Sequence, residues 1–215
     1  MAPRQVHGDM TEAATVETRR RATYADLEAV PDHLVAEILR GRLVTHPRSS
    51  KRHSRVHFRL GAVLNCPFDE GIDGPGGWYF LTEPELHLGE EICVPELAGW
   101  RLERILPAPA ADPFACVKVE LAPDWICEVL SPATERCDRR EKREIYAEAG
   151  IGHLWLVDPR IEVVEAFVLE DRDWRLAGTF SGDQTAQIPP FEVIAIALGR
   201  VWPPRRPVAS PPEEP

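Results

Sequence analysis

Several features that define other protein classes are missing from this chain of 215 residues. No apolar run approaches the roughly 18 residues that a membrane-spanning helix needs, so the sequence predicts neither such a helix nor a membrane partner. The five cysteines are odd in number and include no Cys-x-x-Cys pair, which argues against a disulfide framework or a zinc knuckle. No apolar segment follows the basic residues near the N-terminus, so the sequence predicts no secretory signal. We therefore expect a protein of the reducing cytoplasm.

Lysine is also scarce. The chain has 25 basic residues, of which only Lys51, Lys118 and Lys142 are lysines, so 22 are arginines. A lysine kept in so arginine-rich a chain suggests a role for its compact ammonium group, which differs chemically from the planar guanidinium of arginine.

The composition that remains is that of a folded domain. Hydrophobic residues make up 44% of the chain and charged residues 28%, and this length is sufficient for one domain with a real core. Residues 1–21 lack periodicity and predict a disordered N-terminal arm, whereas residues 203–215 predict a proline-rich tail. The sequence thus places one domain over residues 22–202.

The charge of the chain is unevenly distributed. The net charge of −10 counts against a nucleic-acid partner, yet residues 40–59 hold seven Arg and Lys and no acid. Residues 83–96, in contrast, hold five Glu and no Arg or Lys. This separation is what a phosphate-binding face beside a metal site needs, although a solvated helix face is the alternative. The residues expected to bind nucleic acid are Lys51, Arg52, Arg55 and Arg59.

Hydrophobic periodicity in the first half of the domain predicts short elements with clear boundaries. A hairpin is expected around the Arg40-Gly41 turn, and Ser49 or Ser50 can cap the helix that follows. The expected elements are a helix over 23–30, strands over 34–39 and 42–45, a helix from 50 to about 66, and strands over 78–88 and 93–102.

The second half predicts a crossover unit. An apolar strand over 125–130 is followed by a charged helix over 135–148, capped by Thr134 and stopped by Gly150, and then by a returning strand over 154–157. A hairpin over 163–169 and 174–180 completes the pattern. A strand, a helix and a returning strand indicate an α/β fold with a mixed sheet.

Glu128 is a carboxylate inside the apolar strand. Burying it is costly unless a divalent cation or an arginine compensates its charge, and both alternatives are open. Asp124 is unsuitable as a second ligand, because positions four apart on one strand are about 13 Å apart. Glu96 follows Val94-Pro95 into a neighbouring apolar stretch. Two carboxylates with a backbone carbonyl, assigned here to Val129, suit Mg²⁺ or Mn²⁺.

A cation near these carboxylates could position an attacking water. A lysine two residues after Glu128 would share its strand face, but Leu130 occupies that position. The following helix offers a substitute, because Asp138, Lys142 and Tyr146 are spaced four apart and form one ridge. The alternative is a solvent-facing Lys142 that pairs with Asp138.

His53 and His57 have the i, i+4 spacing of a two-histidine metal site. On the expected helix they fall on the side of Leu60 and Leu64, so we interpret them as packing residues.

Three segments of the chain resemble the Uma2 (DUF820) family. The run EVLSPATERCDRREKREIYAEAGIGHLWLVDP resembles its central signature, VPELAGWR its Pro-Asp element and AEILRGRLV its N-terminal hairpin. The resemblance extends over about residues 22–202. It implies a restriction-endonuclease-like PD-(D/E)XK core, a mixed sheet flanked by helices, with the active-site lysine moved to a helix. The residues that it implies are a catalytic triad of Glu96, Glu128 and Lys142, an additional acid at Glu37, and supporting residues at Asp138 and Tyr146.

The function that this resemblance implies is metal-dependent cleavage of phosphodiester bonds, with DNA as the expected substrate. The family usually has Asp where Glu96 stands. That departure, together with Leu130, favours the alternative of a nuclease-fold module that only binds nucleic acid or a protein. Strand edges and exposed apolar residues are compatible with a homodimer.

Overall fold

The computed structural model describes residues 20–47, 50–105 and 117–204. The arm expected over residues 1–21 and the tail expected over 203–215 lie outside the described residues, apart from the two residues at the inner end of each. Within the described residues, no helix is long and apolar enough to cross a membrane.

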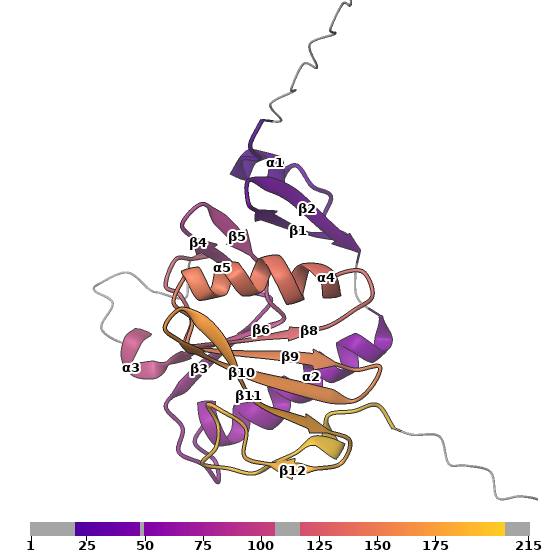
Figure 1. Cartoon of the computed structure of the whole chain (residues 1–215), viewed down its shortest axis with the longest axis vertical. Helices are drawn as coiled ribbons and strands as arrows, with labels where there is room; N and C mark the ends of the chain where they lie inside the picture. The colour runs from indigo at the N-terminus through magenta and orange to yellow at the C-terminus, as the bar shows by residue number, and fades with distance from the viewer. Residues whose placement is uncertain (1–19, 48–49, 106–116, 205–215) are drawn as a thin grey trace, which may run out of the picture.

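A six-stranded sheet forms the centre of the fold (Figure 1). Its strand order is β11-β10-β9-β8-β6-β3, and it is mixed because β8 and β9 are parallel whereas the other pairs are antiparallel. This confirms the predicted α/β fold. The strands are β3 (Trp78–Thr82), β6 (Leu97–Arg101), β8 (Trp125–Val129), β9 (His153–Asp158), β10 (Val163–Glu170) and β11 (Asp173–Ser181).

A second sheet of five strands contains the predicted N-terminal hairpin, which follows the short helix α1 (Tyr24–Glu28). Arg40 and Gly41 both have left-handed backbone angles, with φ of 53° and 73°, as a two-residue hairpin turn requires. The strands, in the order of the sheet, are β2 (Arg42–Pro47), β1 (Leu34–Leu39), β5 (Glu91–Cys93), β4 (Glu85–Leu88) and β7 (Lys118–Val119).

The two long strands expected over 78–88 and 93–102 are each broken in two. The chain leaves the six-stranded sheet after β3, enters the five-stranded sheet as β4 and β5, and returns as β6. Both breaks contain a proline, Pro84 and Pro95, which cannot donate a hydrogen bond to a strand ladder. Where the chain crosses, the Glu83 amide donates to the Glu96 carbonyl at 3.1 Å. The breaks therefore bring the backbones of two acidic residues together.

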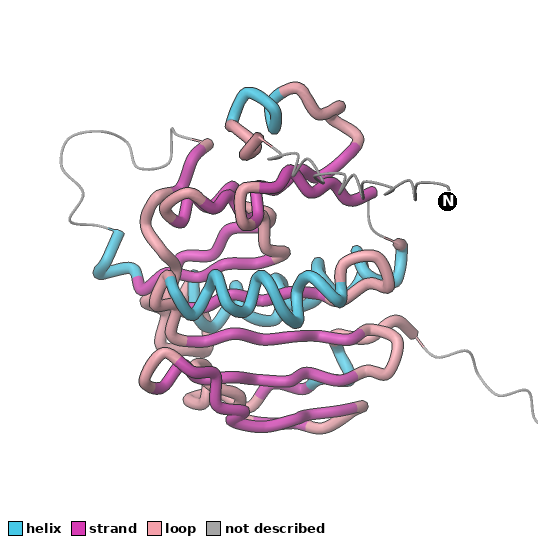
Figure 2. The backbone as a smooth tube through the Cα atoms, turned by 45° about the horizontal axis from the view of Figure 1, so that its top comes forward, coloured by secondary structure: helices cyan, strands magenta, loops and turns pink. Residues whose placement is uncertain are grey.

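Helices cover both faces of the six-stranded sheet (Figures 1 and 2). On one face lies α2 (Lys51–Leu64), where the Ser50 hydroxyl accepts from the His53 amide as predicted; the π-helical η1 (Asn65–Asp69) follows. On the other lies the predicted crossover helix, which consists of α4 (Glu135–Cys137), the π-helical η2 (Asp138–Lys142) and α5 (Arg143–Glu148). The predicted cap was wrong in one respect, because Thr134 makes no capping hydrogen bond with its side chain.

Strand alternation divides the core between these two faces. Val56 and Leu60 of α2 pack with Trp125 and Trp155, whereas Ile145 of α5 packs with the alternate strand residues. The C-terminal segment adds its apolar residues to the α2 side. The remaining elements are α3 (Leu102–Ile105), β12 (Thr185–Ala186), β13 (Ile196–Ala197) and η3 (Leu198–Arg200).

Candidate active site

A cavity of about 640 Å³ lies where β8 ends and β6 begins, between α2 and the crossover helix. Because these strands are antiparallel, the end of one and the start of the other meet at the same edge of the sheet. The acids and the lysine that the sequence singled out all line this cavity. Residues of α2 and of the two segments in which the chain passes between the sheets line it as well. The lining side chains include Glu37, His53, His57, Glu83, Glu96, Glu128, Asp138 and Lys142.

Lys142 occupies the centre of the acidic side of this cavity, with a side chain only 3% exposed. Its Nζ is 2.7 Å from Glu128 Oε1, 3.0 Å from Glu37 Oε1 and 3.7 Å from Asp138 Oδ1. The alternative of a solvent-facing lysine is therefore wrong. Burial alone would lower the pKa of Lys142, but the surrounding carboxyl groups outweigh burial and raise it well above the ordinary value. The group is a permanent ammonium ion.

The helix that supplies Lys142 is locally widened. Residues Asp138–Lys142 form one π-helical turn within an otherwise α-helical segment. Such turns insert an extra residue and re-aim the side chains around them, and they are frequent at functional sites. Asp138, Lys142 and Tyr146 are all buried on the sheet side of this helix, so the predicted ridge faces the site.

Glu128 projects from the buried strand β8 toward the crossover helix. Tyr146 Oη donates to its Oε1 at 2.5 Å, and Lys142 contacts the same oxygen. The compensating cation is thus a lysine, and the interpretation of an arginine salt bridge is wrong. Burial is the largest cause that raises the pKa of Glu128 to about 8, with Lys142 opposing it and Asp138 and Glu37 adding to it.

Glu37 reaches the same ammonium group from β1 of the second sheet. Its Oε1 accepts from the Val94 amide at 2.8 Å, and its Oε2 is 3.4 Å from His46 Nε2. Burial alone would raise the pKa of Glu37, but Lys142 and these hydrogen bonds outweigh burial and lower it. Glu37 is therefore the ionised partner of Lys142.

Glu96 lies one residue before β6, so it is adjacent to the strand rather than inside it. Leu97 pairs with Cys127, so the next position of the ladder places Glu96 opposite Glu128. Its carboxylate nevertheless contacts α2, where its oxygens are 3.0 Å from His53 Nε2 and 3.1 Å from His57 Nδ1. Burial alone would raise the pKa of Glu96, but these two imidazoles outweigh burial and lower it to about 2.

The interpretation of the two histidines as packing residues was incomplete. His53 does lie on the buried stripe of α2 with Val56 and Leu60. Both imidazoles, however, contact Glu96, and the i, i+4 spacing was the signal that pointed to this shared contact. Glu83, on the lining of the same cavity, carried no comparable signal because the chain crossing that positions it was not foreseen.

The Val129 carbonyl, the predicted backbone ligand, accepts from His53 Nε2 at 2.6 Å. The same nitrogen contacts Glu96, so one imidazole N–H lies between two of the predicted ligand groups. Burial alone would lower the pKa of His53, but the hydrogen bond that His53 donates to Glu96 and the charge of Glu96 outweigh burial and raise it.

The predicted nucleic-acid contacts lie on α2, but not all four are free. Arg52 Nη1 donates to the Pro159 carbonyl at 3.3 Å, and Arg59 Nε donates to the Arg200 carbonyl at 2.8 Å. Lys51 and Arg55 are exposed, and within the described residues they form no ion pair. The role of this basic surface stays a prediction.

Comparisons with known proteins identify the family and the fold of the chain. The sequence profile of Uma2, described as "Putative restriction endonuclease", matches residues 21–199. The chain belongs to the Uma2 family. A solved structure from Anabaena variabilis, described as "a putative nuclease belonging to DUF820", is similar with a TM-score of 0.66 over 84% of this chain and 97% of that chain. Its sequence identity is 18%, so this likeness concerns the fold. No curated protein matches the chain.

Replacing Tyr146 by Phe tests the support that the helix gives to Glu128. We expect Tyr146→Phe to lower the free energy of unfolding by about 1–3 kcal/mol, because the buried carboxyl group loses its hydrogen-bond donor. Denaturant unfolding measures the change. In the Glu128→Gln background the same substitution should cost less, since the carboxyl group is gone. An equal cost in both backgrounds would show that the Tyr146 hydroxyl does not act through Glu128.

Proposed function

We propose that this Uma2-family chain is a metal-dependent endonuclease that hydrolyses phosphodiester bonds in DNA. The observation that carries the proposal is the Lys142 ammonium group, buried between Glu37 and Glu128 in a cavity that Glu96 also lines. A buried lysine among carboxyl groups at one edge of a sheet has the residue types that phosphodiester hydrolysis with a divalent ion needs.

The chain has suitable donors for Mg²⁺ or Mn²⁺. Glu96, Glu128 and the Val129 carbonyl would hold the ion, because hard dications prefer oxygen ligands. Glu96 Oε2 supports this assignment, since it is buried and has no hydrogen-bond partner. When bound, the ion would supply positive charge that stabilises the reacting phosphate group.

The other residues act by holding charge and position. Lys142 retains its proton, so we assign it the stabilisation of negative charge that develops on the phosphate, together with the orientation of the attacking water. Glu37 is its ionised partner and fixes the ammonium group. Tyr146 and Asp138 are positioning residues, the first through its hydrogen bond to Glu128 and the second through its ion pair with Lys142.

The exposed basic residues of α2 are proposed to contact the phosphate backbone. We expect the double variant Lys51→Ala/Arg55→Ala to bind duplexes of every sequence more weakly, because phosphate contacts carry no sequence information. The slope of log K against log salt should decrease in magnitude by about 1–2, at roughly 0.9 per lost contact. Arg52 and Arg59 are left intact because they donate to backbone carbonyls. An unchanged slope would assign this surface to solvation alone.

The second candidate is a module that binds nucleic acid or a protein without cleaving. The two imidazoles on Glu96 favour it, because they already compensate the carboxylate that the ion would need. Labelled duplex DNA and single-stranded RNA of the same sequence, incubated with the purified chain and Mn²⁺, separate the candidates. We expect internal cleavage of the DNA. Binding of DNA without cleavage at any Mn²⁺ concentration would favour the module.

A further inference from the structure

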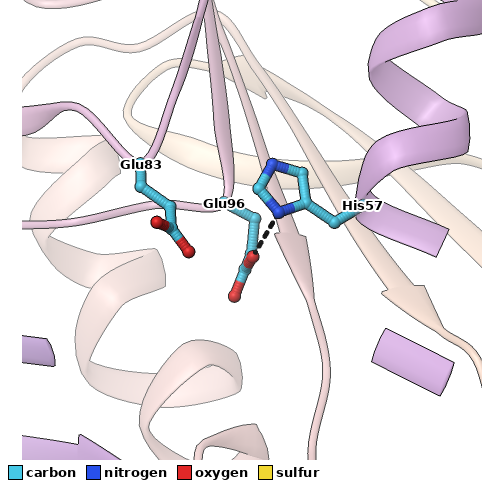
Figure 3. A group of neighbouring side chains, drawn as sticks. All are labelled: His57, Glu83 and Glu96. Atoms are coloured by element: carbon cyan, nitrogen blue, oxygen red, sulfur yellow. Dashed lines mark ion pairs between the residues drawn. The ribbon is translucent and has the colours of Figure 1, made fainter. Parts of the chain in front are cut away.

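A group of three side chains on the α2 side of the cavity has the composition of a transition-metal site. His57 comes from α2, Glu83 from the turn between β3 and β4, and Glu96 from the residue before β6 (Figure 3). Their ligand atoms all lie within 4.8 Å of one another. Since one ion binds ligands at about 2.0–2.2 Å, ligand atoms at this separation need little movement to share it.

The backbone around this group is already fixed. His57 lies within a helix whose buried face packs on the sheet, so the backbone position of this residue is fixed. Glu83 and Glu96 are held together by the hydrogen bond of 3.1 Å between the Glu83 amide and the Glu96 carbonyl. The three ligands therefore come from elements that do not have to fold around the ion.

A buried atom without a partner points to a missing ligand. Glu96 Oε2 is inaccessible to solvent and has no hydrogen-bond partner. The contact of 3.1 Å between His57 Nδ1 and Glu96 Oε2 is within ion-pair distance but does not have hydrogen-bond geometry. An unsatisfied buried polar atom destabilises the fold, so an ion bound to this oxygen would stabilise the carboxylate.

We propose that His57, Glu83 and Glu96 bind a transition-metal dication, and that the imidazole makes the site prefer Mn²⁺ to Mg²⁺. Neutral imidazole is a good ligand for transition-metal ions and a poor one for Mg²⁺, whereas carboxylates accept both. Glu96 belongs to this site and to the catalytic set proposed above, so the two are adjacent. The part that this ion takes in cleavage rests on the proposed function, but its binding does not.

Calorimetric titration of the full chain with MnCl₂ and, separately, with MgCl₂ tests the proposal. We expect His57→Gln to weaken Mn²⁺ binding at least about tenfold and to change Mg²⁺ binding little, because the amide oxygen replaces an imidazole. Glu83→Gln should weaken binding of Mn²⁺ as well, and because Glu83 is exposed, its substitution should leave the fold intact. Melting temperatures measured without metal check that point.

Matched controls come from exposed residues outside the cavity. His33→Gln and Glu120→Gln make the same chemical changes at exposed positions and should leave Mn²⁺ affinity at the parental value. Parental Mn²⁺ affinity in both His57→Gln and Glu83→Gln would overturn the proposed site. Mn²⁺ binding that depends on His57 in a protein that cleaves no nucleic acid would support this site and contradict the proposed function.

Discussion

Lys142→Arg is expected to lower metal-dependent DNA cleavage by about 100-fold or more while DNA binding persists. The ammonium group lies 2.7 Å and 3.0 Å from its two carboxyl partners in a buried position. The planar guanidinium of arginine is larger, so it cannot occupy the same point or present the same charge to the substrate. Single-turnover cleavage rates, with DNA affinities measured in parallel, give the result.

Lys118→Arg is the matched control for this experiment. Lys118 lies on the surface, where its Nζ is 3.7 Å from the centre of the Tyr24 ring, a contact that arginine also makes well. The cleavage rate of Lys118→Arg should equal that of the parent. Lys142→Ala should lose activity as Lys142→Arg does. Parental activity in Lys142→Arg would remove the lysine from the mechanism and favour the binding module.

Glu128→Gln is expected to abolish cleavage and, at the same time, to stabilise the protein at alkaline pH. The pKa of Glu128 is about 8 in the folded protein against an ordinary value of 4.5. As pH rises from 4.5 to about 8, Glu128 loses its proton in the unfolded chain but keeps it in the folded protein. The free energy of unfolding therefore decreases over this range, and the whole decrease is present above about pH 8. Glutamine does not ionise and escapes this loss.

Melting temperatures of parent and Glu128→Gln between pH 5 and pH 9 measure this difference. The advantage of the variant should grow as pH rises. Glu120→Gln, an exposed substitution of the same kind, should leave the melting temperature unchanged at each pH. A constant difference across the range would contradict the raised pKa of Glu128. Active sites often contain such groups, which are retained for function at the expense of stability.

The crossover unit could be predicted from the sequence because its signals are local. The apolar strand that contains Glu128, the charged helix and the returning strand each have their own periodicity and stop signals, and the structure has all three. The four-residue spacing of Asp138, Lys142 and Tyr146 predicted that they share one helix face, and the structure buries that face. The π-helical turn within that ridge was not predicted, since nothing in the local pattern specifies it.

The other half of the site depends on contacts between distant segments. The sequence predicted continuous strands through Pro84 and Pro95, whereas the chain changes sheets at both positions. This crossing places Glu83 beside Glu96 and turns the Glu96 carboxylate toward α2. Local periodicity contains no information on which sheet a strand joins. For Glu37, only the family resemblance suggested a role, because its partner Lys142 is more than 100 positions away in the chain.

Cleavage of supercoiled plasmid DNA tests the central claim most directly. The purified parent and Glu128→Gln, prepared in parallel, are each incubated with plasmid in Mn²⁺ or in EDTA. We predict nicked and linear products only for the parent with Mn²⁺. Equal cleavage by Glu128→Gln in Mn²⁺, or cleavage by the parent in EDTA, would contradict a metal-dependent nuclease site built on Glu128.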